Sequence, residues 1–250
     1  MDITGGSWIY CGNVSTLELE IRDRVAIVTM AAGENRLNLG MCAALLNMLD
    51  KVERETDALT LVVKSAHERV WCYGFDTDWI KQIQSEGNEA SLKEFLVRDL
   101  ELRRRLLLFP LITVAAINGH VFGGGAILSC CFDFRFMRSD RGFFCIPAVD
   151  LGYPVVSGTV ALLKQVLPVH MLVDAMLTGR RFTGEEVASA RVVKATYTND
   201  ILLDKVMEFA LHLNKDRGII GKMKEVQNRH IIHLLDTEDL NTVQAGIFRV

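Results

Sequence analysis

Three consecutive glycines, Gly123 to Gly125, are the part of the sequence that points most clearly to chemistry. They follow an apolar run that predicts a buried strand over 111–117, and an apolar helix is expected to begin at them. Glycine in the first turn of a helix forfeits about 1 kcal/mol relative to alanine, a loss that a close approach to this backbone would explain. Free N–H groups at a helix start, with the positive end of the helix dipole behind them, suit a developing negative charge. The pattern therefore predicts an oxyanion hole, with a tight strand-to-helix packing point as the alternative.

The glycine run matches neither common phosphate-binding motif. No Gly-Lys-Ser/Thr follows it, as a P-loop needs, and its spacing differs from that of the dinucleotide fingerprint. The nearest titratable side chain is His120, directly after the bend Asn118–Gly119. An imidazole pKa of about 6.5 would let His120 move a proton at neutral pH, with hydrogen bonding inside the bend as the alternative.

The elements that must position these residues follow from hydrophobic periodicity. A hairpin is expected over 17–21 and 25–30, then a helix over 39–52 and a buried strand over 59–63. A capping-box pattern at 91–94 predicts the start of a long helix that ends before Pro110. Past the glycines we expect strands at 134–137 and 142–146, helices at 155–167, 171–177 and from a second capping box at Thr183, and a β-bridge at Val192–Val193.

The last fifty residues show helical periodicity and no strand pattern. Amphipathic helices are predicted over 202–213, 219–235 and 238–248, with little of the chain left to cover them. Their apolar faces favour subunit packing, and folding back onto their own domain is the alternative. The sequence thus predicts an α/β core over residues 1–198 and a C-terminal helical segment over 199–250.

Composition narrows the possible partners. Half of the 250 residues are hydrophobic, 24% are charged and the net charge is −3, so no basic field indicates nucleic acid or an anionic membrane. Neither a signal peptide in the first twelve residues nor an apolar run of about 18 residues is present, so we expect a cytoplasmic protein. The cysteines have no paired metal spacing and predict reduced core thiols, and His230 and His233 lack a third ligand, so no metal site is predicted.

Four ordered segments resemble the crotonase, or enoyl-CoA hydratase/isomerase, superfamily. The glycine run preceded by 116–119 is similar to the most specific signature of that family, and 71–76 resembles its aromatic-Cys-Ala-Gly-x-Asp segment. The loop over 33–38 is similar to the one that lies beside coenzyme A, and 147–152 resembles the Pro-Glu-x-x-Leu-Gly segment. The resemblance implies a spiral core of ββα units and a C-terminal segment that assembles trimers or dimers of trimers.

The resemblance also implies a substrate and a site. The substrate would be an acyl-CoA thioester, with coenzyme A as part of it and no permanently bound cofactor. The backbone N–H groups of Phe75 and Gly124 would form the oxyanion hole. Residues expected to bind coenzyme A are Arg36, Asn38, Tyr73, Asp76, Gly123 and Gly125.

The sequence departs from the family where proton transfer is expected. The two positions that carry glutamate in hydratases correspond to Ile127 and Ala148, and the acid that some isomerases carry just beyond Leu-Gly corresponds to 155–157, Val-Val-Ser. Because enolate stabilisation moves no proton by itself, another base is needed. Asp150 and His120 are the candidates, while Tyr153 and Ser157 can donate a hydrogen bond but are poor bases. Glu94, Asp99 and Glu101 lie on a helix that borders the acyl pocket in members of that family, but a solvated helix face is the better interpretation of these carboxylates.

The sequence therefore favours an acyl-CoA enzyme of the enoyl-CoA isomerase/hydratase type, with Ala148 at the position of a missing carboxylate. One alternative is a weakly active or non-catalytic acyl-CoA-binding protein that kept the pocket. Another is a thioesterase or decarboxylase of the same fold.

Overall fold

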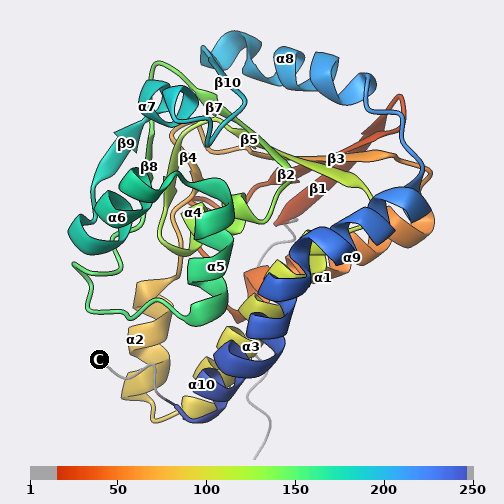
Figure 1. The fold of residues 1–250 in the computed structure, drawn as a ribbon. Helices are drawn as coiled ribbons and strands as arrows, with labels where there is room; N and C mark the ends of the chain where they lie inside the picture. The colour runs from red at the N-terminus through yellow and green to blue at the C-terminus, as the bar shows by residue number, and fades with distance from the viewer. Residues whose placement is uncertain (1–15, 247–250) are drawn as a thin grey trace, which may run out of the picture.

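Two β-sheets form the centre of the computed structural model, which describes residues 16–246 (Figure 1). The larger sheet has the strand order β1-β2-β3-β5-β7-β10, in which only the pair β1 and β2 is antiparallel. The hairpin is confirmed, and its turn residues Asp23 and Arg24 both have positive φ, as a tight two-residue β-turn requires. The bounds are β1 Leu17–Arg22, β2 Val25–Met30, β3 Thr60–Ser65, β5 Ile112–Ile117, β7 Phe134–Arg138 and β10 Ala195–Tyr197.

The smaller sheet consists of three-residue strands in the order β4-β6-β8-β9. Its last pair is antiparallel and the others are parallel. The bounds are β4 Val70–Cys72, β6 His120–Phe122, β8 Phe143–Cys145 and β9 Arg181–Thr183.

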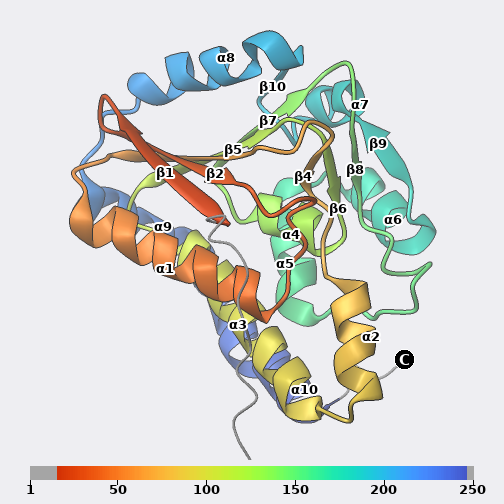
Figure 2. The same cartoon turned by 180° about the vertical axis from the view of Figure 1, so that it is seen from behind.

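Helices surround both sheets, as Figure 2 shows from behind. Their bounds are α1 Leu39–Glu55, α2 Thr77–Ser85, α3 Glu89–Leu107, α4 Gly124–Cys130, α5 Ser157–Val166, α6 Val169–Thr178, α7 Gly184–Ser189, α8 Asn199–Leu211, α9 Arg217–Leu234, a π-helical turn at Leu235–Asp239, and α10 Leu240–Gln244.

The chain follows a repeated path through these layers. A strand of the larger sheet is followed by one of the smaller sheet and then by helix, first as β3-β4-α2-α3, then as β5-β6-α4, then as β7-β8-α5. The parallel pairing of β3, β5 and β7, and of β4, β6 and β8, makes each repeat one turn of a spiral. The predicted ββα spiral is confirmed, and its successive turns bring 71–76, 120–125 and 143–148 side by side.

The C-terminal helices pack on their own chain. One face of the larger sheet is covered by α8, whose Leu202, Val206 and Met207 join a buried cluster with strand residues such as Ile27 and Val62. At the start of α9, the Arg217 guanidinium donates to the carbonyl oxygens of Glu53, Thr56 and Ala58. Folding back, the alternative that the sequence left open, thus accounts for α8 and the start of α9.

Several predicted boundaries are wrong. The helix expected from Ser91 begins at Glu89, because the Oδ1 atom of Asn88 accepts the Ser91 N–H at 3.2 Å and caps the helix one turn earlier. The bridge expected at Val192–Val193 is replaced by β10, which pairs with β7. In place of a helix over 238–248, the π-helical turn continues into α10, and residues 247 and 248 lie outside the described part, as do 1–15.

Within residues 16–246, no helix is long and apolar enough to cross a membrane. The cysteines of this range, Cys42, Cys72, Cys130, Cys131 and Cys145, are buried and have free thiols.

Candidate active site

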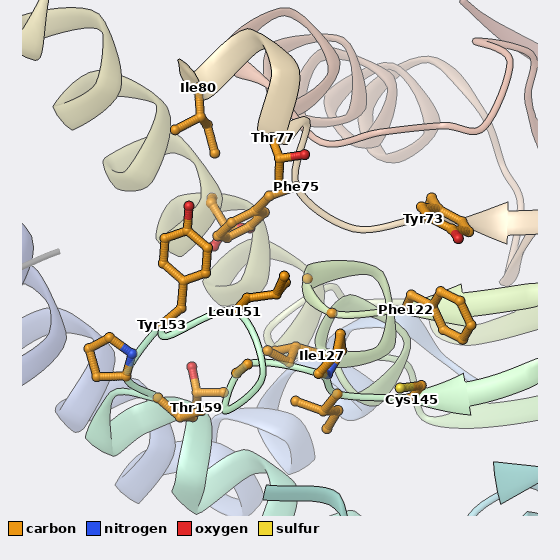
Figure 3. Close-up of a pocket in the computed structure, with 18 of the residues that line it drawn as sticks. Tyr73, Phe75, Thr77, Ile80, Phe122, Ile127, Cys145, Leu151, Tyr153 and Thr159 are labelled. Carbon is orange, nitrogen blue, oxygen red and sulfur yellow. The ribbon is translucent and has the colours of Figure 1, made fainter. Parts of the chain in front are cut away.

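A cavity of about 500 Å³ lies where the turns of the spiral meet the helices α2, α3 and α10 (Figure 3). One part of its wall comes from Phe75 and Gly124, and another from Ala148 in the segment that follows β8. The wall beyond these residues is mostly apolar, with Ile80, Leu96, Leu100, Ile127, Val155, Val156 and Val243. A concave and largely apolar site of this size suits an acyl chain.

The three glycines are required for three different reasons. Gly123 has φ +52, a conformation that side chains rarely adopt. A Cβ on Gly124 would lie 2.7 Å from the Phe75 ring, and one on Gly125 would lie 2.4 Å from the carbonyl oxygen of Cys72. The glycine run therefore provides both access to the cavity and close packing. Gly123 and Gly124 line the cavity, whereas Gly125 is packed tightly against β4.

Phe75 is held by an isolated parallel bridge to Leu37. In this bridge the Leu37 N–H donates to the Gly74 oxygen at 2.7 Å, and the Asp76 N–H donates to the Leu37 oxygen at 2.8 Å. Because successive N–H groups of an extended chain point to opposite sides, the Phe75 N–H points away from Leu37. Gly74 allows this course with φ +89.

Gly74 also brings the two segments together. A Cβ at this position would lie 3.1 Å from the Gly124 nitrogen. Within residues 16–246, neither the Phe75 N–H nor the Gly124 N–H donates to a protein acceptor, and Gly124 is the first residue of α4. Two free donors in one wall, one of them at a helix start, suit a developing oxyanion.

The cavity mouth carries the Arg36 side chain. Its guanidinium lies over the Tyr73 ring, 5.1 Å from the centroid, and pairs with the Glu34 carboxylate at 2.8 Å. Across the mouth, the Arg181 guanidinium lies 5.6 Å from the centroid of Phe122. Both arginines line the cavity, so the mouth is cationic and aromatic while the interior is apolar.

Two of the predicted coenzyme A contacts have local structural roles. Asn38 caps α1, accepting the Met41 N–H at 3.0 Å, and Asp76 caps α2, accepting the Trp79 N–H at 3.1 Å. The Asn38 amide also donates to Asp76 at 3.1 Å, which joins the starts of the two helices. Neither residue lines the main cavity, although both border a small hollow beside Arg36.

The two predicted bases lie in different places. Asp150 is exposed at the rim of the cavity, with its carboxylate against Gly179. His120 is packed between the rings of Phe122 and Phe143 and is not part of the cavity lining. Burial, together with the charges of Arg181 and Arg141, lowers the pKa of His120.

The interpretation of Asp99 as a solvated helix residue is wrong. Its neighbours in that prediction, Glu94 and Glu101, are exposed, but Asp99 is 2% exposed and lines the cavity. It forms an ion pair with Arg103, whose Nη1 donates to Thr159 Oγ1 at 2.8 Å. Helical periodicity could have predicted the burial of this pair, because both residues fall on the apolar stripe of α3 with Phe95, Leu102 and Leu106.

Metal ligation has no support in residues 16–246, where no group of three or more His, Cys, Asp or Glu side chains could hold an ion. His230 and His233 are both exposed on α9.

The spiral of ββα units, and the meeting of the Gly74 and Gly123 segments at one cavity, are the arrangement expected of the crotonase superfamily. A family model described as "Enoyl-CoA hydratase/isomerase" matches residues 20–242, and the chain belongs to this family.

Curated relatives agree with this assignment. The chain is similar to Enoyl-CoA delta isomerase 2, peroxisomal, of Arabidopsis thaliana, with 27% identity over 73% of this chain and 78% of that protein. It is also similar to Carnitinyl-CoA dehydratase of Salmonella arizonae, with 35% identity over 45% of this chain and 43% of that protein.

Solved structures share the fold. An enoyl-CoA isomerase of Mycobacterium tuberculosis superposes with a TM-score of 0.81 at 22% identity, covering 92% of this chain and 98% of that one. An enoyl-CoA hydratase of Bacillus halodurans superposes with a TM-score of 0.84 at 19% identity, covering 94% and 96%.

Proposed function

We propose that this chain is an acyl-CoA enzyme that shifts a carbon–carbon double bond in an enoyl-CoA through a thioester enolate. The observation that carries the proposal is the pair of unpartnered N–H groups, of Phe75 and Gly124, in the wall of one apolar cavity. Two such donors aimed at the enolate oxygen contribute several kcal/mol, roughly 3–4 for each one lost in comparable sites.

The cavity orients the substrate from its mouth to its interior. Arg36 gives a phosphate group of coenzyme A a charge-assisted contact, and Tyr73 offers a ring face to the adenine or the pantetheine arm. Past the two N–H groups, the acyl chain meets Ile80, Leu96 and Val243, which exclude water from the reacting carbons.

Isomerisation is favoured over hydration by the cavity wall. Adding water across a double bond needs an acid and a base that hold the water between them, and Ile127 and Ala148 are both apolar. Moving one proton from the α to the γ carbon needs a single group that accepts it and returns it. The curated isomerase relative, which covers most of the chain, supports the same choice.

The proposal is tested with three substrates and purified protein. A 3-enoyl-CoA should gain the absorbance of a conjugated thioester, a 2-enoyl-CoA should lose it only slowly, and a saturated acyl-CoA should release no thiol. Thiol release would indicate the thioesterase alternative. Binding of all three without turnover would indicate the non-catalytic acyl-CoA-binding protein and would contradict the proposal.

The coenzyme A contact is tested separately. Arg36→Ala should raise the Kd for acyl-CoA about tenfold, the loss of one charge-assisted contact. Arg22→Ala is the matched control, because Arg22 also pairs with a glutamate two residues away but lies in β1 and does not line the cavity.

A further inference from the structure

Four buried polar side chains meet at the cavity from three separate elements. Asp99 and Arg103 belong to α3, Thr159 to α5, and Asp239 to the π-helical turn after α9. All four are at most 4% exposed. Asp99, Arg103 and Thr159 line the cavity, whereas Asp239 does not.

The hydrogen bonds of this cluster leave one oxygen of the cavity-lining carboxylate without a partner. Asp99 Oδ2 pairs with Arg103 Nη2, and Arg103 Nη1 donates to Thr159. Among residues 16–246, Asp99 Oδ1 is buried and has no hydrogen-bond partner, and neither do Arg103 Nε and Asp239 Oδ2. A buried oxygen without a partner costs about 1–3 kcal/mol, so its retention calls for a ligand that uses it.

Asp239 caps a helix and does not line the cavity. Its Oδ1 accepts the Gly158 N–H at 2.9 Å and so caps α5, which has no capping side chain of its own. The carboxylate thereby fixes the start of the helix that carries Thr159. Asp239 and Thr159 position Arg103, and Arg103 positions Asp99.

Asp99 also lies close to both segments that supply the N–H donors. One helical turn before it, the Phe95 ring packs edge-on against the Phe75 ring, with centroids 5.0 Å apart. Burial is the main cause that raises the pKa values of Cys72, in β4, and of Cys131, the residue after α4, and the negative charge of Asp99 adds to both rises. Asp99 thus belongs to the helix that packs on Phe75, and it lines the same cavity as Phe75 and Gly124.

We propose that Asp99 is the general base of this site, accepting the α-proton of a 3-enoyl-CoA on Oδ1 and returning it to the γ carbon. The inference rests on the proposed isomerase function. As the C–H bond at the α carbon breaks, its electron pair forms the enolate, whose oxygen the Phe75 and Gly124 N–H groups hold. When the proton bonds to the γ carbon, the thioester carbonyl re-forms and the double bond lies between the α and β carbons. The Asp99 carboxylate is ionised again at the end of the reaction, as it was at the start.

Two opposing effects act on the pKa of Asp99. Burial raises it, while the charge and hydrogen bond of Arg103 oppose that rise. The thiols of Cys42, Cys72 and Cys131 interact with the charge of Asp99, and Asp239, whose own pKa is raised by burial, interacts with the charge of Arg103. Burial holds the thiol pKa values well above neutrality, that of Cys72 at about 12, so the thiols stay neutral through an ordinary assay range.

The first test is Asp99→Asn, assayed on a 3-enoyl-CoA. We expect kcat to fall by about 10²–10⁴, with KM and acyl-CoA affinity changed less than about threefold. Glu101→Gln is the matched control on the same helix, because Glu101 is exposed and paired with Arg98 at 2.8 Å. A folded Asp99→Asn protein that keeps kcat within about fivefold of the parent overturns the inference and leaves the proposed isomerase function standing.

Two further measurements do not depend on the folding of that variant. Asp99→Glu keeps the charge and moves the oxygen by about one bond, so kcat should drop at least about tenfold with acyl-CoA affinity retained. In the parent, kcat should fall about tenfold per pH unit below the pKa of Asp99, and this pKa should lie above the usual value of about 4. A kcat that stays constant down to about pH 4, in wild-type enzyme that is still folded and active there, overturns the inference. A wild-type protein that never isomerises a 3-enoyl-CoA overturns the proposed function together with it.

Discussion

Gly74 and Phe122 are so close that a Cβ added to Gly74 would lie 2.6 Å from the carbonyl oxygen of Phe122. This contact sets the separation between the segment that carries the Phe75 N–H and the one that carries the Gly124 N–H. Both donors are backbone N–H groups, so substituting the side chain of the same residue does not remove them. Their positions can be changed only by moving the backbone.

Gly74→Ala should therefore disable the site more than it destabilises the fold. The new Cβ pushes the two segments apart and lowers kcat by about 10²–10³, the loss typical of one misplaced oxyanion donor. Gly87→Ala is the control, because Gly87 has a similar φ of +66 but nothing within 4 Å of its Cβ position. Steady-state kinetics and urea denaturation of both variants check the prediction, and equal kcat values in the two would contradict it.

Ala148→Glu should rescue Asp99→Asn. Ala148 lines the cavity, and the N–H of Gly123 donates to the Cys145 oxygen at 2.9 Å, which ties the glycine run to the strand that precedes Ala148. Apolar neighbours such as Val155 and Val156 should raise the pKa of the new carboxyl towards neutrality. In the Asp99→Asn background we expect isomerisation to rise at least about tenfold, with hydration still slow because Ile127 supplies no second acid.

The rescue is measured as the conjugated-thioester signal from a 3-enoyl-CoA. Ala148→Gln in the same background controls for the volume of the side chain and should give no rise. A double variant that folds, binds acyl-CoA and gains no activity would show that the Ala148 side chain does not reach the reacting carbons.

Asp239→Asn should change how stability depends on pH. Burial raises the pKa of Asp239 in the folded protein, so as pH rises above about 4 the unfolded chain loses its proton first. The unfolded state then binds fewer protons, and the free energy of unfolding of the wild type falls by up to about 1.4 kcal/mol per pH unit until the folded pKa is passed. Below about pH 4 both states are protonated and this loss disappears.

The asparagine variant lacks that loss, so its free energy of unfolding relative to the wild type should increase between about pH 4 and neutrality. Urea denaturation at several pH values checks this. Asp236→Asn, an exposed carboxylate of the same turn paired with Arg104, serves as the control. A difference between variant and wild type that is constant with pH would contradict the prediction.

Assembly into trimers, or dimers of trimers, is expected from the family resemblance and from the outer face of α9. Ile219, Met223 and Val226 follow helical spacing there and are 57%, 63% and 65% exposed. Light scattering should give three or six times 28.0 kDa, and Met223→Glu should lower the mass, unlike Lys222→Glu on the same helix. A wild-type mass of one 28.0 kDa chain at micromolar concentration would contradict the prediction.

Much of the larger sheet could be predicted because its strands β2, β3 and β5 contain apolar runs. The strands β4 and β6 could not be, because three residues carry no periodicity and their pairing is set by the spiral. The capping pattern at Ser91 was misleading because Asn88 provides a cap three residues earlier.

The glycine run pointed to a segment that does line the cavity, because glycine occurs where the backbone needs close packing or a positive φ. Its role as an oxyanion hole stays a prediction. Asp99 was missed because it lies in a stretch rich in charged residues, 98–105, which resembles a solvated helix surface until Asp99 and Arg103 are both placed on the apolar stripe. Asp239 had no local signal at all, as it meets Gly158 across 81 positions of sequence.

The π-helical turn at Leu235–Asp239 has a consequence for how this chain could change over generations. Such a turn is what one extra residue inserted into an α-helix produces. Losing that residue would close the turn into regular α-helix and leave the residues after it, Val243 among them, on the face that they now occupy. A single-codon deletion in this turn would therefore be tolerated by the cavity wall, whereas the same deletion within α9 or α10 would rotate the following residues by about 100°.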